Sequence, residues 1–384
     1  MLAAVPRETF PGEKRVAIVP RDVAALTKAG LELVIENGAG SAAFHADAEY
    51  EAQGARVEAD RSRLFGAADI LLTVRGPGAY REFPEQDLSS MKPGAVVAGF
   101  LDPLDDPAMM KSLAERGLTL LSMELMPRIT RAQSMDALSS MATISGYKAV
   151  LLAANAAPRI FPMLMTAAGT ITAARVFVLG AGVAGLQAIA TARRLGGLVD
   201  GYDVRPAVKE QVESLGARFV VLDVKTEQAE AAGGYAKAQS EEFYRRQQQL
   251  LGEHLRAMDV IITTAAVPGK KAPVLITAEM VEGLRPGTVI VDLAAERGGN
   301  CALTKPGETI GHGGVLILGP QNLPSEVPAH ASQLYSKNLA TYLAHLVKQG
   351  GLQLSEEDEI VSGTLVARSG KVVHSMVLQA LEGK

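Results

Sequence analysis

Residues 175–185 read Arg175-Val-Phe-Val-Leu-Gly180-Ala-Gly182-Val-Ala-Gly185, an apolar run that passes into three spaced glycines. We expect a strand, a tight turn and a helix here, followed by a second strand at Leu198–Asp203. Gly180 permits the turn, Gly182 lets the backbone approach a phosphate, and Gly185 lets the helix pack closely on its strand. Because N–H groups at a helix start attract phosphates, the pattern predicts a Rossmann-type dinucleotide site.

Asp203 ends the second strand, where a carboxylate can accept hydrogen bonds from a ribose 2′-hydroxyl. A 2′-phosphate about 4 Å from this carboxylate would cost on the order of 4 kcal/mol per unit charge at a surface-like dielectric. The residue therefore favours NAD(H) over NADP(H). Arg205, two positions further on, can soften that preference.

Composition excludes several classes of protein. The chain has 384 residues, 48% of them apolar, and a formal net charge of −4, with no basic cluster that would indicate nucleic-acid binding. Its single cysteine, Cys301, excludes an internal disulfide framework and a Cys-rich zinc site. The N-terminus is charged too early for a secretory signal, and we expect no membrane-spanning stretch. These features predict a cytoplasmic protein.

Short apolar runs alternate with helical patterns along the chain, which is typical of doubly wound α/β domains with parallel sheets. The expected strands are Leu2–Val5, Leu31–Ile35, Asp69–Val74, Ala95–Phe100 and Leu118–Met123, then Arg175–Leu179, Leu198–Asp203, Arg218–Leu222, Asp259–Thr264, Thr288–Asp292 and Val315–Leu318. We expect two Rossmann-like domains: residues 1–140 with 325–384, and the NAD-binding residues 141–324. The NAD site is expected in the interdomain cleft, and the methionines of Met163-Leu-Met165 are expected to fill an interdomain core.

One connection, between Leu222 and Asp259, is much longer than a crossover needs. It contains the hinge-capable pair Gly233-Gly234 followed by Tyr235, and then a polar helix at Glu241–His254. From the residues alone, a surface insertion and a lid that closes on the nucleotide are equally good interpretations.

A second informative stretch is Glu124-Leu-Met-Pro-Arg128-Ile-Thr-Arg-Ala-Gln133-Ser-Met-Asp136-Ala-Leu-Ser139-Ser. It strongly resembles the NAD(H)-binding component, domain I, of proton-translocating NAD(P)+ transhydrogenases of the alanine dehydrogenase/PNT family. Similar stretches extend from Pro6-Arg-Glu to Val361-Ser-Gly-Thr, so the resemblance covers essentially the whole chain. It implies a Si-specific, proton-translocating transhydrogenase subunit.

The resemblance implies residue roles. The loop would contact the nicotinamide end of the cofactor through Arg128, Gln133, Asp136 and Ser139, of which Asp136 could orient Arg128. Gln, Ser and Arg offer the donors and acceptors that a carboxamide needs. Tyr235 would be the tip of a mobile loop that closes over bound nucleotide. The implied cofactor-binding residues are Ile129, Gly180, Gly182, Val183, Ala184, Gly185, Asp203, Val204, Arg205, Gly234, Tyr235, Gln247 and Ala266.

An alanine-dehydrogenase-type amino-acid dehydrogenase is the alternative, because it shares this architecture. Such enzymes must move a proton as well as a hydride, and they keep a lysine and a histidine near the substrate. At the corresponding stretches this chain reads Thr73-Val-Arg75-Gly-Pro77 and Gly99-Phe100-Leu101-Asp102, although the family's N-terminal arginine remains as Arg15. Hydride exchange between two nicotinamides needs positioning rather than an acid or base, so the transhydrogenase is the preferred interpretation.

That interpretation implies partners. NAD(H) would bind here and NADP(H) on a beta subunit, and a membrane-embedded subunit would carry the proton channel. The chain would form a homodimer attached peripherally to these subunits at the cytoplasmic face of the inner membrane, with no span of its own. The six histidines show no metal-ligand spacing, so no metal site is expected.

Overall fold

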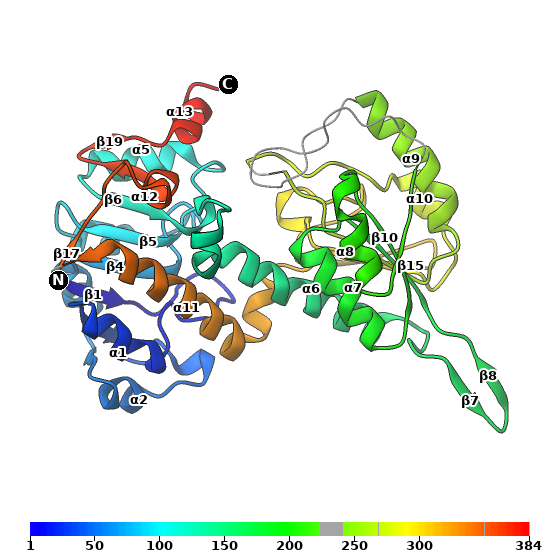
Figure 1. Cartoon of the computed structure of the whole chain (residues 1–384), viewed down its shortest axis with the longest axis horizontal. Coiled ribbons are helices and arrows are strands. Elements are labelled where there is room, and N and C mark those ends of the chain that lie inside the picture. Colours follow the sequence, from blue (N-terminus) through cyan, green and yellow to red (C-terminus); the bar gives the residue numbers. More distant parts are fainter. Residues whose placement is uncertain (223–240, 268, 349, 384) are drawn as a thin grey trace. The chain divides into compact units, whose positions relative to one another are not determined.

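The computed structural model describes residues 1–222, 241–267, 269–348 and 350–383. These residues form two compact units, each built on its own sheet (Figure 1). The first unit combines Met1–Met141 with Pro324–Lys384, and the second consists of Ala142–Leu323. The predicted α/β class with two doubly wound sheets is confirmed.

In the described residues, the sheet of the first unit has the strand order β19-β18-β6-β5-β4-β1-β2-β3. Its strands are β1 (Leu2–Val5), β2 (Glu32–Glu36), β3 (Arg56–Glu58), β4 (Ile70–Arg75), β5 (Val96–Phe100), β6 (Thr119–Ser122), β18 (Leu365–Arg368) and β19 (Lys371–Val372). The strands β1 to β6 run parallel, and β18 joins β6 antiparallel. The C-terminal segment thus completes the sheet that the N-terminal third begins.

Helices cover this sheet and connect its strands (Figure 1). They are α1 (Pro20–Lys28), α2 (Asp47–Ala52), α3 (Arg61–Ala67), α4 (Glu85–Ser90), α5 (Pro107–Glu115), α11 (Pro328–Leu346), α12 (Glu359–Thr364) and α13 (Ser375–Leu381). A two-stranded ladder, β16 (Val347–Lys348) with β17 (Gly351–Leu352), follows α11. Apolar residues of α3, α5 and the strands form a buried core.

Among the described residues, the sheet of the second unit has the order β11-β10-β9-β12-β13-β15-β14, and all of its pairings except β14 with β15 are parallel. The strands are β9 (Arg175–Leu179), β10 (Leu198–Tyr202), β11 (Arg218–Phe219), β12 (Val260–Thr263), β13 (Val289–Asp292), β14 (Thr309–His312) and β15 (Val315–Leu318). The described helices that follow its strands are α7 (Val183–Arg194), α8 (Lys209–Ser214), α9 (Glu241–Leu255) and α10 (Ala278–Glu282). The chain order reverses between β9 and β12, so ligands are expected at the carboxyl ends of these strands.

β9 shows why these runs form central strands. Val176 and Val178 pack into one apolar cluster, and Phe177 and Leu179 pack into another. Alternate side chains of a strand point to opposite faces, so a continuous apolar run fits a sheet that is covered on both faces. The expected strands agree with the observed ones to within a residue at each end, except that Arg218–Leu222 shortens to Arg218–Phe219.

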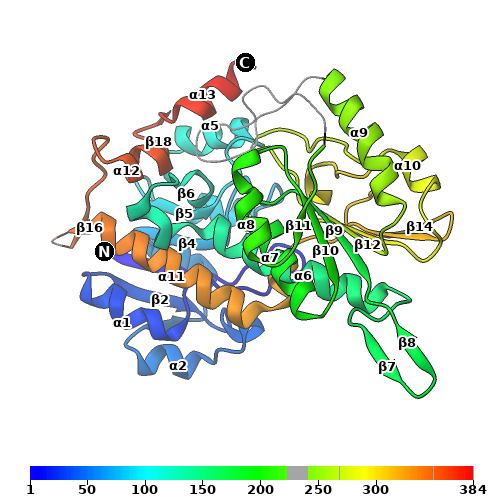
Figure 2. The same cartoon turned by 45° about the vertical axis from the view of Figure 1, so that its right-hand side comes forward.

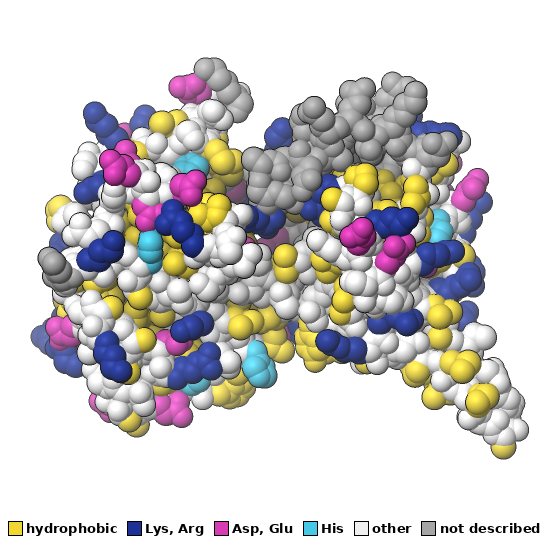
Figure 3. Space-filling model, viewed as in Figure 1, with side chains coloured by type: hydrophobic (Ala, Val, Ile, Leu, Met, Phe, Trp, Pro, Cys, Tyr) yellow, Lys and Arg dark blue, Asp and Glu magenta, His cyan; other side chains and the backbone are white. Residues whose placement is uncertain are grey.

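A hairpin of β7 (Leu164–Thr166) and β8 (Gly169–Ile171) projects from the second unit (Figure 2). Met163 and Met165 are 59% and 77% exposed, so the expectation that they fill a core is wrong. The surface of the hairpin is a mixture of apolar and uncharged polar side chains, as the space-filling view shows (Figure 3). A short apolar run alone does not distinguish an exposed hairpin from a buried segment.

The helix α6 (Ala137–Ala156) meets the length and hydropathy of a membrane span, although the sequence pattern predicted no such stretch. Its mean hydropathy over the apolar window is 1.2, and Lys148 is its one charged residue. In the structure Ala149, Val150 and Ala153 pack in the core of the second unit. A core helix satisfies the same test, so α6 is weak evidence for a membrane segment.

Candidate functional site

The glycine-rich turn lies at the carboxyl end of β9, beside the point where the strand order reverses. Gly180 has φ +95°, a conformation that favours glycine, and its N–H donates to the Tyr202 carbonyl over 2.8 Å. Gly182 is the N-cap residue of α7, and a Cβ at this position would meet no atom within 4 Å. The turn therefore leaves open space beside the first N–H groups of α7, where phosphate oxygens bind well.

Gly185 has a different role in the same turn. A Cβ on Gly185 would lie 1.8 Å from the Gly180 carbonyl oxygen, so no side chain fits between helix and turn. Gly146 on α6 shows the same constraint, because its Cβ would lie 2.1 Å from the Ala184 carbonyl oxygen. The sequence did not predict this role for Gly146, since a single glycine inside a helix gives no indication of which element it packs against.

Asp203 follows β10 directly and is 8% exposed. Its Oδ2 accepts the Ala181 N–H over 2.7 Å, which joins the end of β10 to the glycine turn. The Arg205 side chain pairs with the same carboxylate through Nε at 2.8 Å and Nη2 at 2.8 Å. The carboxylate therefore lies where the sequence predicted it, already engaged by protein donors.

Neighbouring strands fix the remaining loops at this edge. Thr264 Oγ1, after β12, donates to the Gly180 carbonyl oxygen over 3.0 Å. Asp292, at the end of β13, is fully buried and accepts from Thr263 Oγ1 and from the N–H groups of Asn300 and Cys301. The Thr264 bond holds the loop after β12 against the turn, and the Asp292 bonds hold the loop after β13 against the end of its own strand, structural roles that the sequence did not reveal.

Two of the less specific predictions lie on this unit. Gln247, on α9, is fully buried and donates Nε2 to the Tyr202 hydroxyl over 2.9 Å, while its Oε1 has no partner among the described residues. Ala266 is exposed in the loop after β12, and Val204 is partly buried beside Asp203. Gly234 and Tyr235 lie outside the described residues.

The predicted nicotinamide loop lies in the first unit, between β6 and α6, and includes a 3₁₀ segment at Thr130–Met135. Arg128 and Gln133 are exposed, and Ile129 is half-buried. Asp136 precedes α6, where its Oδ1 accepts the Ser139 N–H over 2.9 Å and its Oδ2 accepts the Ser139 hydroxyl over 2.6 Å. Asp136 therefore caps a helix, a role that the sequence did not reveal, and its expected role in orienting Arg128 stays a prediction.

The C-terminal segment anchors this loop through contacts that the sequence could not predict, because the partners lie far apart in the chain. Asn338 on α11 donates Nδ2 to the Ser134 carbonyl oxygen over 2.9 Å. Arg131 pairs with Asp358 over 2.8 Å. Asn338 is only 6% exposed, so its bond positions the 3₁₀ segment from a packed helix.

A network of buried charges lies near the carboxyl end of β4 in the first unit. Glu13 accepts Arg15 Nε over 2.7 Å and Nη2 over 2.6 Å, and it lies 3.6 Å from Arg75 Nε. Burial alone would raise the pKa of Glu13, but the Arg15 guanidinium lowers it to about 2. Burial, with the nearby Glu13 carboxylate, raises the pKa of Glu8 to about 8. Arg15 thus faces an internal carboxylate.

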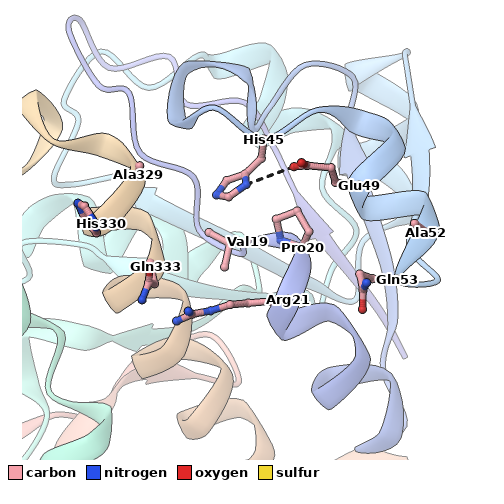
Figure 4. Close-up of a pocket in the computed structure, with 10 residues that line it drawn as sticks. All are labelled: Val19, Pro20, Arg21, His45, Glu49, Ala52, Gln53, Ala329, His330 and Gln333. Atoms are coloured by element: carbon pink, nitrogen blue, oxygen red, sulfur yellow. Dashed lines mark ion pairs between the residues drawn. The ribbon is translucent and has the colours of Figure 1, made fainter.

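A separate pocket of about 500 Å³ opens on the first unit, and none of the predicted nucleotide residues lines it (Figure 4). His45 points across it towards Glu49, with the ring nitrogen Nδ1 3.4 Å from the carboxylate. The other lining residues are Val19, Pro20, Arg21, Ala52, Gln53, Ala329, His330 and Gln333. Among the described residues, no group of three His, Cys, Asp or Glu side chains is arranged to hold a metal ion.

Comparison with known proteins assigns the class. The N-terminal domain of the alanine dehydrogenase/PNT family matches residues 4–145, and its C-terminal domain matches residues 149–375. The chain belongs to this family, and the resemblance recognised in the sequence is confirmed.

One relative and two solved structures show how similar the chain is to particular members of the family. The chain is 48% identical over 379 residues to the first part of NAD(P) transhydrogenase subunit alpha of Rhodospirillum rubrum, covering 97% of this chain and 98% of the relative. A crystal structure of transhydrogenase from Sinorhizobium meliloti superposes with a TM-score of 0.86 at 44% identity, covering 97% of this chain and 100% of that one. An L-alanine dehydrogenase structure superposes with a TM-score of 0.82 at 25% identity, covering 100% and 99% of the two chains.

Proposed function

We propose that this chain is the NAD(H)-binding subunit of a proton-translocating NAD(P)+ transhydrogenase. Hydride would pass between NADH bound here and NADP+ bound on a partner subunit, coupled to proton movement across the membrane. The observation that carries the proposal is the glycine turn at the switch point of the second sheet, with Asp203 at the end of the adjacent strand. The transhydrogenase names of the relatives from Rhodospirillum rubrum and Sinorhizobium meliloti support it.

The residues present fit a dinucleotide. The open space at Gly182 and the start of α7, at Val183 and Ala184, suit the pyrophosphate, and Asp203 suits the adenosine ribose. The buried Gln247 Oε1, without a partner among the described residues, is an acceptor that a nucleotide donor could satisfy. When bound, NAD(H) supplies the nicotinamide C4 that releases or accepts the hydride.

The loop Arg128–Ser139 is proposed to hold the nicotinamide end. Arg128, Gln133 and Ser139 offer the donors and acceptors that a carboxamide needs, and Ile129 offers an apolar contact. Asp136 acts indirectly, by holding Ser139 at the start of α6. The loop needs no proton-transferring side chain, because positioning supplies most of the catalysis in hydride exchange.

The alternative, an alanine-dehydrogenase-type enzyme, is less well supported. A substrate carboxylate seeking Arg15 would have to displace Glu13, which holds the guanidinium through two hydrogen bonds. At the stretches where such enzymes keep a lysine and a histidine, this chain has Arg75 and Phe100-Leu101-Asp102. These substitutions remove the groups that would move the proton.

The proposal requires other polypeptides. The relatives are named as subunit alpha, and we propose that this chain forms a homodimer and works with an NADP(H)-binding beta subunit and a membrane-embedded proton-channel subunit. It would then lie at the cytoplasmic face of the inner membrane, attached through those subunits.

Two assays test the proposal with the purified chain. Mixed with an NADP(H)-binding partner domain, it should catalyse hydride exchange between NADH and an NADP+ analogue. Alone, with alanine and NAD+, it should form no NADH. Tight NADH binding without exchange would reduce the chain to a nucleotide-sensing module, and steady NADH formation from alanine would establish the alternative.

A further inference from the structure

We infer that the Arg205 side chain occupies the positions on Asp203 that the ribose hydroxyls would need and must leave before NADH can bind, which makes Arg205 a specificity-determining residue. The inference rests on the proposed NAD(H) function and goes beyond it. According to this inference, the Arg205 side chain weakens NADH binding and also lowers the preference for NADH over NADPH.

The geometry of the Asp203 carboxylate is the first step. Oδ1 accepts the Arg205 N–H over 2.9 Å and Arg205 Nε over 2.8 Å. Oδ2 accepts the Ala181 N–H over 2.7 Å and Arg205 Nη2 over 2.8 Å. A carboxylate offers about four lone-pair positions, so these four donors fill it.

The donors differ in whether they can leave. The N–H groups of Ala181 and Arg205 belong to the backbone of the glycine turn and of the residues after β10, and losing them would break the turn. The Arg205 Nε and Nη2 belong to a side chain that can rotate away. They approach the carboxylate as a two-pronged fork, and two adjacent ribose hydroxyls would need the same two positions. The guanidinium and the ribose therefore compete for Asp203.

Burial strengthens the ion pair between Arg205 and Asp203 that the ribose must displace. The side chains of Arg205 and Asp203 are only 12% and 5% exposed, so water screens the pair less than it screens a surface ion pair. NADH binding must break this charge-assisted pair and replace it with hydrogen bonds from neutral hydroxyls. The intrinsic affinity of Asp203 for the ribose is thus partly masked in the wild-type chain.

The displaced guanidinium has a second effect. Arg205 remains two residues from Asp203, where it can pair with a 2′-phosphate if the nucleotide carries one. The carboxylate repels that phosphate, and the guanidinium offsets part of the repulsion. Arg205 therefore weakens NADH binding and assists NADPH binding, so it lowers the ratio between the two affinities.

The test compares Arg205→Met with Arg218→Met. Arg218 makes the same kind of two-pronged contact, with Nε 3.0 Å and Nη2 2.5 Å from Asp200 on β10, but its side chain is 69% exposed and lies away from the glycine turn. NADH and NADPH affinities of the full chain are measured by nucleotide fluorescence, association rates by stopped flow, and folding by thermal melts.

Arg205→Met should bind NADH about three- to tenfold more tightly and associate with it faster, because the competing fork is gone. Its NADPH affinity should fall or stay level, so the discrimination ratio should rise. Arg218→Met should match the wild type in both. A purely structural Arg205 would weaken both nucleotides together, and that result, or an unchanged ratio in a folded Arg205→Met, overturns the inference.

A second variant, Arg205→Lys, keeps the inference testable if Arg205→Met does not fold. Arg205→Lys keeps the charge but cannot form the fork, and it should give an intermediate gain in NADH affinity; no gain in this folded variant counts against the inference. The wild-type measurement separates this inference from the proposed function. If the wild-type chain binds no NADH, the proposed function fails. If it binds NADH and Arg205→Met changes nothing, the inference alone fails.

Discussion

Gly182 and Gly185 lie three residues apart, yet the structure gives them different predicted phenotypes. Gly182 has φ −76° and open space around its missing Cβ, so Gly182→Ala should leave the thermal melt near that of the wild type. The added methyl group would stand where we propose that the pyrophosphate binds, so NADH affinity should fall at least about tenfold. Gly185→Ala should instead lower the melting temperature, because its Cβ would overlap the Gly180 carbonyl oxygen. Equal melting temperatures for the two variants would contradict this assignment.

Asp203 should control both the affinity and the choice of nucleotide. Asp203→Asn keeps the size of the side chain but removes the charge, so it should weaken NADH binding and raise tolerance of NADPH. Asp200→Asn, three residues earlier on β10, also loses a carboxylate paired with an arginine and serves as the control. Titrations of both nucleotides check the prediction. An unchanged ratio of NADH affinity to NADPH affinity in Asp203→Asn would contradict the proposed contact between Asp203 and the ribose.

Glu8 makes stability depend on pH in an unusual direction for a carboxylate. Its pKa is raised from 4.5 to about 8, so the folded protein holds the proton more tightly than the unfolded chain does. The associated stability is complete below pH 4.5 and is lost as the pH rises towards 8, by up to about 1.4 kcal/mol per pH unit. Glu8→Gln should flatten this slope in denaturant melts between pH 5 and 8.

Glu13, the other buried carboxylate of this network, provides a comparison for that experiment. Its pKa is lowered to about 2, so its contribution is complete above pH 4.5 and is lost only as the pH falls towards 2. Glu13→Gln should therefore destabilise the protein, and it should reduce the slope between pH 5 and 8 only in part, because burial raises the pKa of Glu8 more than the Glu13 carboxylate does. A residual slope in Glu8→Gln is expected from Glu124, because burial and the nearby Asp102 raise its pKa to about 7. The same slope in Glu8→Gln as in the wild type would contradict the assignment.

At the scale of elements, α11 and the 3₁₀ segment Thr130–Met135 act as one piece. Asn338→Ala removes the bond to the Ser134 carbonyl oxygen and should cost about 1 kcal/mol of stability. Because the loop carries Gln133, hydride exchange should slow more than NADH binding weakens. Thr341→Ala on the same helix, whose exposed hydroxyl bonds to the Lys337 carbonyl oxygen within α11, is the control. Equal exchange rates in the two variants would show that α11 does not position the loop.

The strands could be predicted more fully than the contacts between distant elements. Continuous apolar runs such as Val176–Leu179 specify buried parallel strands, and the spaced glycines specify the turn that follows. The anchoring of the loop by Asn338 could not be predicted, because no local pattern pairs it with Ser134, 204 residues away. The prediction for Met163–Met165 is wrong for a related reason. The apolar residues alone do not show whether the segment packs in a core or lies exposed in a hairpin, as it does here.

The site shows the same limit at the level of side-chain partners. The motif placed Gly180, Gly185 and Asp203 where the structure has them, since each is determined by the turn and the strand end. The side chains that donate hydrogen bonds to the Asp203 and Asp136 carboxylates could not be predicted from the motif. Arg205 donates to Asp203 and Ser139 donates to Asp136, and both contacts depend on the folded backbone and on the rotamers that it allows.

At the scale of the whole molecule, the two units should contribute to different kinetic quantities. Variants of the second unit, such as Gly182→Ala, should raise the Kd for NADH and leave the exchange rate at saturating nucleotide nearly unchanged. Gln133→Ala in the first unit should do the reverse, lowering the exchange rate with the partner domain by at least about tenfold.

Gln133 is exposed, so the melting temperature of Gln133→Ala should equal that of the wild type. Asp136→Ala should lose both hydride exchange and the helix cap of α6. If Gln133→Ala weakens NADH binding as much as Gly182→Ala does and exchanges hydride normally once saturated, the first unit only binds nucleotide, and the proposed division is wrong.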